Sequence, residues 1–183
     1  WFTYVNNEPV NFLDPWGLCP SSDAQAAKKG FVAKLFEKIS SKGVDINLFP
    51  KDEKIYEYAE KIKKEKNTFM VGAHGSPSNM WGPDSKIISP EDLAEQIKSN
   101  ENYKQGQIIK LFSCKTGQIE TAGDDTFAQQ LADVFGTGTV VVAPDDLAWL
   151  SSNGTTEVAP RNPENPKKPD KDNPGNWNTF IGR

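Results

Sequence analysis

The sequence has little histidine, little cysteine and no long apolar segment. Its 183 residues include a single histidine, His74, and two cysteines, Cys19 and Cys114. No apolar run approaches the ~20 residues of a membrane-spanning helix, so we expect no membrane insertion. Two cysteines in a chain of this size are not a disulfide framework, and we expect no disulfide between them. With one histidine, the chain has one side chain suited to act as a base in the neutral pH range.

The sequence also lacks an excess of basic residues. Its 25 acidic and 21 basic side chains give a net charge of −4 and an isoelectric point near 5.1. A protein that grips phosphate backbones usually presents a basic surface, so nucleic-acid binding is not expected as the main function. Length and a charged fraction of 25% indicate one main globular domain, and no motif calls for a cofactor or metal ion.

Two apolar runs that each end in a reactive residue stand at the centre of the chain. Residues 68–73 run into His74, and residues 107–113 run into Cys114. Both runs have the length and the β-branched or aromatic content of buried strands, and residues 89–98 between them have the pattern of a helix. The three segments predict a βαβ unit in which parallel, adjacent strands bring His74 and Cys114 to the same sheet edge, where open α/β sheets place their sites.

The rest of the chain continues this alternation of helices and strands. Periodicity, capping residues and turn signals predict further helices at 22–42, 51–66 and 125–135, strands at 44–49, 139–143 and 177–181, a hairpin at 147–158, and a mobile surface loop at 161–176. The order of the elements predicts an α/β fold with a mostly parallel sheet and helices on both faces.

The His74 and Cys114 pair has the chemistry of acyl transfer. A thiolate is the attacking form of cysteine, and a neighbouring imidazole can accept its proton. Gly75 permits a close backbone approach, and its amide with that of Cys114 could donate to an oxyanion. The alternative is that Cys114 is a small buried apolar residue and His74 a loop residue. Both residues follow strand ends, so we expect them to lie outside the core.

An apolar run ending in His-Gly, followed forty residues later (74 to 114) by an apolar run ending in Ser-Cys, resembles the caspase-like cysteine peptidases. The resemblance covers about residues 68–144 and implies a caspase-like three-layer sandwich. It implies His74 as general base and acid, Cys114 as nucleophile, and Gly75 with Cys114 as the oxyanion hole. The positions it implies for the substrate pocket are Phe112, Ser113, Val142, Ala143, Pro144, Asp145, Asp146 and Trp149.

One position departs from part of that family. Metacaspases and clostripain-like relatives carry an acidic residue two positions before the cysteine and cut after Arg or Lys, whereas Phe112 stands there in this chain. Asp145 and Asp146 could recognise a basic substrate residue, or they could be solvated or capping residues of a turn.

The pattern Asn-x-Pro-x-Asn-x-x-Asp-Pro-x-Gly-Leu at residues 7–18 resembles the end of the core of RHS-repeat proteins, large bacterial shells that carry a variable C-terminal toxin. The alternative is an ordinary turn. The resemblance implies that residues 1–18 end the shell core, with Asp14 as the aspartate of self-cleavage after Leu18, and that residues 19–183 are the toxin domain. The chain begins with Trp1, so we expect it to be a piece of a longer protein.

Together the two resemblances imply a toxin that a bacterial secretion system delivers to the cytoplasm of a target cell, where it cleaves a protein substrate. They imply the RHS shell of the parent chain and a cognate immunity protein as partners, and we expect the immunity protein to contact the loops at 76–84, which include Met80 and Trp81, and at 115–124. Two other functions stay open. The Cys/His pair also suits a deamidase or an acyltransferase, and the chain could be a non-catalytic α/β domain that binds a partner.

Overall fold

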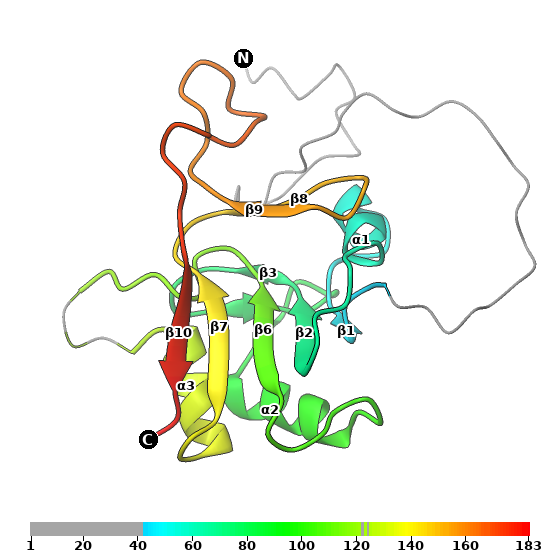
Figure 1. The fold of residues 1–183 in the computed structure, drawn as a ribbon, viewed down its shortest axis with the longest axis vertical. Helices are drawn as coiled ribbons and strands as arrows, with labels where there is room; N and C mark the ends of the chain where they lie inside the picture. The colour runs from blue at the N-terminus through cyan, green and yellow to red at the C-terminus, as the bar shows by residue number, and fades with distance from the viewer. Residues whose placement is uncertain (1–41, 122, 124) are drawn as a thin grey trace, which may run out of the picture.

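A five-stranded sheet forms the centre of the computed structural model, which describes residues 42–121, 123 and 125–183. In spatial order its strands are β1 (Ile46–Asn47), β2 (Thr68–Gly72), β6 (Ile108–Phe112), β7 (Val140–Pro144) and β10 (Trp177–Ile181) (Figure 1). The first four strands are parallel to their neighbours, and β10 runs antiparallel to β7 at the edge. The expected α/β class with a mostly parallel sheet is therefore confirmed.

Two helices cover one face of this sheet. They are α2 (Pro90–Ser99) and α3 (Phe127–Phe135), and both begin with a side-chain cap because Ser89 and Thr126 each accept a hydrogen bond from a backbone N–H three residues ahead. Gly136, with φ of 96°, ends α3. Their apolar sides pack on the sheet residues in a core cluster that includes Val71, Leu93, Ile97, Leu111, Leu131 and Val141. The two helices expected in these regions are confirmed.

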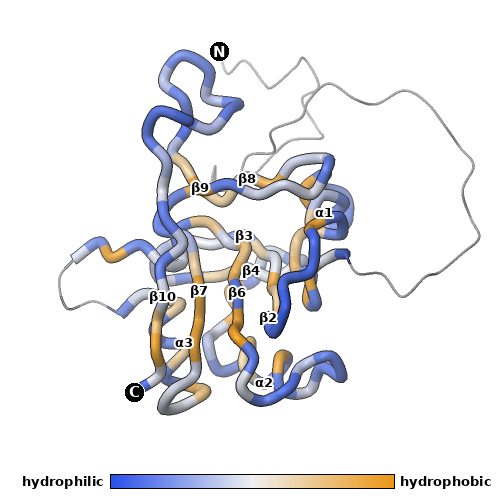
Figure 2. The backbone as a smooth tube through the Cα atoms, viewed as in Figure 1, coloured by the Kyte–Doolittle hydropathy of each residue, from blue (hydrophilic) through white to orange (hydrophobic). Residues whose placement is uncertain are grey.

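The opposite face is covered by a short helix and a hairpin. The helix is α1 (Lys54–Ala59), and the hairpin consists of β8 (Ala148–Leu150) and β9 (Thr156–Val158). Together with this face of the sheet they form a second core cluster that contains Ile55, Tyr58, Met70, Phe112 and Trp149. Figure 2 shows the central strands as the apolar part of the chain and the connecting loops as largely hydrophilic.

Two expected elements are shorter than predicted. The helix expected at 51–66 ends at Ala59, because the carbonyls of Ala59 and Ile62 accept hydrogen bonds from Val44 and Gly43 and leave the helical path. Such a competing backbone partner has no signature in the lysine-rich sequence that follows. The strand expected at 44–49 pairs with β2 only at Ile46 and Asn47.

A small antiparallel sheet between β2 and α2 was not predicted. It consists of β3 (His74–Gly75), β4 (Met80–Trp81) and β5 (Ile87–Ile88), and strands of two residues are too short to create an alternating pattern. Residues 161–176 form an irregular surface loop with side-chain-capped turns, such as those that Asn162 makes with Glu164 and Asn165. In the part of the chain that the structure describes, no helix is long and apolar enough to cross a membrane.

The helix expected at 22–42 and the whole N-terminal segment lie outside the described residues. This applies to Asp14, Leu18 and Cys19, and to the expected boundary between residues 18 and 19. The structure therefore leaves these expectations as predictions.

An ion pair holds the edge strand β10 to α3. Arg183 contacts Asp133 at 2.6 Å and Asp125 at 2.9 Å, and hydrogen bonds from Arg183 lower the pKa of Asp133 from 3.8 to about 2. A depressed carboxyl pKa stabilises the fold above the unfolded-state value, and this contribution is lost as pH falls towards 2. We expect Arg183→Gln to lower the chemical-denaturation midpoint at pH 6 but not at pH 2. An equal difference at both pH values would contradict this assignment.

Candidate active site

The ends of β2 and β6 bring the two predicted reactive residues together. β2 and β6 pair in parallel from Thr68 opposite Ile108 to Gly72 opposite Phe112, and Ala73 extends the ladder by donating to the Phe112 carbonyl. His74 and Cys114 each lie two residues beyond the last pair. Strands in a sheet are about 4.8 Å apart, so the expected juxtaposition at the carboxyl edge of the sheet follows from this register.

Alternation along the strands turns both side chains to the face that α1 and the hairpin cover. Cys114 belongs to the same core cluster as Phe112, two residues earlier, and Phe49. The ring of His74 meets that of Phe49 edge to face, with centroids 5.1 Å apart. Ala73, in contrast, belongs to the cluster on the other face. The two reactive side chains therefore border one apolar cluster at its upper end.

His74 has one engaged and one unpartnered ring nitrogen. Nε2 lies 2.7 Å from Oε2 of Glu53, while Nδ1 is buried without a hydrogen-bond partner. The residue is only 4% exposed. A buried polar atom without a partner is rare and is typical of sites where a further group acts. The expectation that His74 is a loop residue outside the core is wrong, because its ring is enclosed by Glu53 and Phe49.

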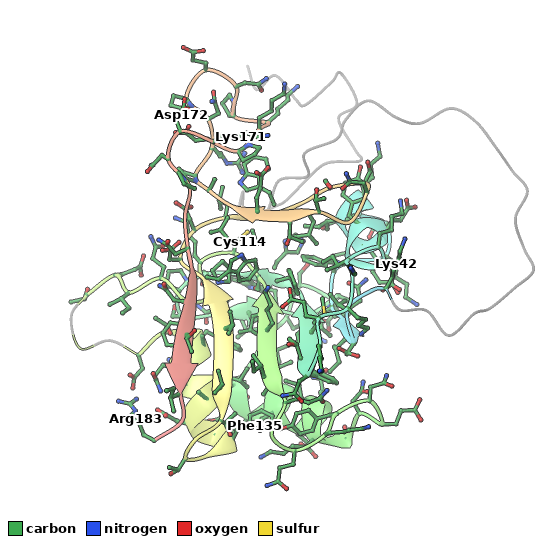
Figure 3. The ribbon with its side chains drawn as sticks, in the orientation of Figure 1. Lys42, Cys114, Phe135, Lys171, Asp172 and Arg183 are labelled. Atoms are coloured by element: carbon green, nitrogen blue, oxygen red, sulfur yellow. The ribbon has the colours of Figure 1, made fainter. Side chains whose placement is uncertain are left out.

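The sulfur of Cys114 is enclosed and oxidised. Cys114 is disulfide-bonded, contrary to our expectation, and Cys19, the other cysteine of the sequence, lies outside the described residues. Pairing depends on the distance between two Cα atoms in the folded chain, which sequence spacing does not give. The Cys114 side chain is fully buried, and its Sγ accepts a hydrogen bond from the backbone N–H of Ala148 at 3.3 Å. Figure 3 shows Cys114 between the end of the sheet and the β8–β9 hairpin.

Gly75 packs closely against the segment that carries Cys114. A Cβ at Gly75 would collide with Oγ of Ser113 and would lie 2.8 Å from Cγ2 of Thr116 and 3.1 Å from the carbonyl oxygen of Cys114. The close backbone approach expected for Gly75 is therefore present. Ser113 is fully buried, and its Oγ, like Nδ1 of His74, has no hydrogen-bond partner.

The residues expected to form a substrate pocket fall into two groups. Phe112, Ser113, Ala143, Pro144 and Trp149 are buried, whereas Val142, Asp145 and Asp146 are half-buried. The Trp149 indole donates to the carbonyl of Ala159 at 2.9 Å, which fixes it inside the second core cluster. The buried members are core residues in this structure, so of the eight only the half-buried three have partly accessible side chains.

Asp145 and Asp146 line a surface pocket of about 430 Å³ beside the loop that follows Cys114. Asp145 accepts hydrogen bonds from the backbone and side-chain amides of Asn176, and Asp146 accepts from the N–H of Leu147. These bonds are those of turn-capping carboxylates, one of the two roles considered for these residues. The pocket also includes Ile119, which is 63% exposed.

Sequence reasoning missed two contributors to the site. Glu53 lies 21 positions before His74, and Ala148 lies 34 positions after Cys114, and neither belongs to a recognisable motif. Among the described residues, no group of three or more His, Cys, Asp or Glu side chains could hold a metal ion. Met80 is fully buried and Trp81, opposite His74 in the β3–β4 pairing, is half-buried.

The contact at Gly75 leads to a stability prediction. We expect Gly75→Ala to destabilise the protein by about 1–3 kcal/mol, because the new methyl group overpacks a closed site. Adding Ser113→Ala should recover part of this loss, since that change removes the colliding Oγ and breaks no hydrogen bond. Urea unfolding of the two variants and of Ser113→Ala alone measures this. An unchanged midpoint for Gly75→Ala would show that the backbone approach is looser than described.

Comparisons with known proteins give a family for the chain. Residues 44–158 match the family described as a domain of unknown function, DUF8616. The chain is also 39% identical over 85 residues to the putative uncharacterized protein YibJ of Escherichia coli (strain K12), a match that covers 46% of this chain and 34% of that protein. No solved structure matches the chain. Because the family match spans most of the described fold, including His74 and Cys114, the chain belongs to the DUF8616 family.

Proposed function

We propose that this chain is a cysteine peptidase in which His74 and the reduced form of Cys114 carry the reaction. The observation that supports it best is the buried, unpartnered Nδ1 of His74 at the sheet edge that also holds Cys114. An imidazole nitrogen with no other use is free to take a proton from a thiol. The resemblance to caspase-like peptidases, which places the same two residue types after successive parallel strands, supports the same assignment.

The reaction follows from the groups present. The Cys114 thiol gives its proton to His74, and the thiolate attacks the substrate carbonyl to form a C–S bond. The backbone N–H of Ala148, 3.3 Å from Sγ, favours the negatively charged sulfur. Collapse of the tetrahedral intermediate breaks the peptide C–N bond, and His74 returns the proton to the leaving amine. Water, deprotonated by His74, then hydrolyses the thioester and releases the acid product and Cys114.

Because the attacking group is a thiolate, the proposal concerns the protein after its Cys114 disulfide has been reduced. Reduction is what a bacterial or host cytoplasm provides, which agrees with the RHS resemblance of residues 7–18. We propose on this basis that the domain is a delivered toxin that cleaves a protein in the target cell and is neutralised by an immunity protein. Gly75 and Cys114 are proposed to donate their amides to the oxyanion, and the pocket at Asp145 and Asp146 is proposed to hold a substrate side chain.

The decisive experiment expresses the chain in the cytoplasm of a bacterium and compares it with Cys114→Ala. We expect growth inhibition and new protein N-termini in the proteome with the native sequence and neither with the variant, at equal expression. Inhibition by both proteins would exclude Cys114 chemistry. Inhibition that depends on Cys114 without new N-termini would instead favour a deamidase or an acyltransferase.

A further inference from the structure

Glu53 stands at the first position of α1 but does not cap it. It occupies the N-cap, with φ of −88° and ψ of 140°, and its side chain makes no capping hydrogen bond. Ser, Thr, Asp and Asn, whose short side chains reach the first helical N–H groups, are the usual residues at this position. The longer Glu53 side chain extends away from the helix instead, and its carboxylate meets the ring of His74.

The backbone of Glu53 is fixed on both sides. Its N–H donates to the carbonyl of Pro50 at 3.1 Å, and its own carbonyl accepts from Tyr56 at 3.1 Å. The residues that follow place Ile55, Tyr58 and Ala59 in the second core cluster. A carboxylate that projects from such an anchored turn reaches one place only, so its contact with His74 is a property of the fold.

The contact selects one tautomer of the ring. An ionised carboxylate can only accept hydrogen bonds, so Nε2 of His74, 2.7 Å from Oε2 of Glu53, carries the proton. In the neutral imidazole the lone pair then lies on Nδ1, which is the buried atom without a partner. The side chains of His74 and Glu53 are 5% and 20% exposed, so water competes little for this bond.

The segment that carries Glu53 also sets the ring plane. Phe49, four residues earlier, meets the ring at 84° and packs against Gly72, where a Cβ would lie 2.9 Å from the Phe49 ring. One short stretch of chain between β1 and α1 therefore contacts His74 both edge-on, through Phe49, and end-on, through Glu53. Rotation of the imidazole that exchanged its two nitrogens would break the bond to Glu53.

We propose that Glu53 is the positioning residue of the site: it holds the proton on Nε2 of His74 and so keeps Nδ1 as the base for the Cys114 thiol. The catalytic part of this inference rests on the proposed peptidase function. When His74 takes a proton, the imidazolium forms beside a carboxylate that already faces it, and this preorganised charge stabilises the step. Glu53 itself touches neither the sulfur nor the substrate.

The single histidine makes the ring directly observable. In the reduced protein labelled with ¹⁵N, we expect His74 at neutral pH to show a protonated Nε2, an unprotonated Nδ1 and a downfield ring proton that exchanges slowly with water. In Glu53→Ala this proton should become unobservable through exchange. Glu57→Gln is the matched control, since Glu57 is an exposed carboxylate in the first turn of the same helix, and it should leave the spectrum unchanged.

Kinetics separate positioning from structural support. On a peptide that spans a mapped cut site, Glu53→Ala should lower kcat about 10²-fold, the loss typical of a misplaced catalytic group, with KM unchanged. Glu53→Gln, which retains an acceptor oxygen, should restore part of kcat. A proton on Nδ1 of the native ring, or native kcat in Glu53→Ala, would overturn the role of Glu53 and leave the peptidase proposal standing on Cys114→Ala. The expected ring spectrum in a protein whose activity does not depend on Cys114 would overturn the peptidase and keep the assigned tautomer.

Discussion

The oxidised protein is expected to cleave no peptide, and the same sample should become active when a thiol reductant is added. Cys114 is disulfide-bonded in the structure, and a sulfur in a disulfide cannot supply the thiolate that attacks a carbonyl. The measurement follows cleavage of a fluorogenic peptide that spans a mapped cut site, with free thiols counted in parallel. Activity should rise in proportion to the thiols released.

The control for this experiment is Cys114→Ala, which should be inactive with and without reductant. Reductant can also act by loosening the fold, so the unfolding midpoint of each protein is measured in both states. Equal activity of the native sequence in the oxidised and reduced states would show that the Cys114 sulfur is not the nucleophile. The proposed peptidase mechanism would then be wrong.

His74→Gln is expected to lower kcat by about 10²–10⁴-fold, the usual contribution of a general acid–base group. Glutamine keeps an N–H donor for Glu53 but cannot accept a proton from the thiol, so the variant removes the chemistry and retains the contact. Steady-state kinetics of the reduced protein measure this, and KM should change little. The rate at which iodoacetamide alkylates Cys114 should fall in the same variant, because less thiolate is present.

Stability must be compared separately, since His74 and Cys114 are both buried. Substitutions in such positions commonly cost about 0.5–3 kcal/mol, and Cys114→Ala also removes a disulfide. Each variant is therefore compared with the native sequence in its reduced state, by thermal unfolding. A folded His74→Gln protein with native kcat would exclude His74 as the base and would favour a binding domain in which the two residues serve packing.

Much of the fold was predictable because its elements carry their own signals. The β2, β6 and β7 strands are continuous apolar runs, as strands buried on both faces must be, and α2 and α3 have capping residues at their first turns and apolar residues at helical spacing. The shortened α1 and the sheet of β3, β4 and β5 were not predictable in this way. Their limits depend on backbone partners elsewhere in the chain, such as the N–H groups of Gly43 and Val44 that bond to the end of α1.

For the site, the sequence by itself determined which two residues meet. His74 and Cys114 follow successive strands of a βαβ unit, and parallel strands bring their carboxyl ends to one edge. Only the tertiary structure decided the environment of these residues: the carboxylate of Glu53 on Nε2 of His74, the N–H of Ala148 on the sulfur, and the burial of both side chains. These contacts join segments 21 and 34 positions apart. No periodicity or motif records them, because they arise from how α1 and the β8–β9 hairpin pack over the end of the sheet.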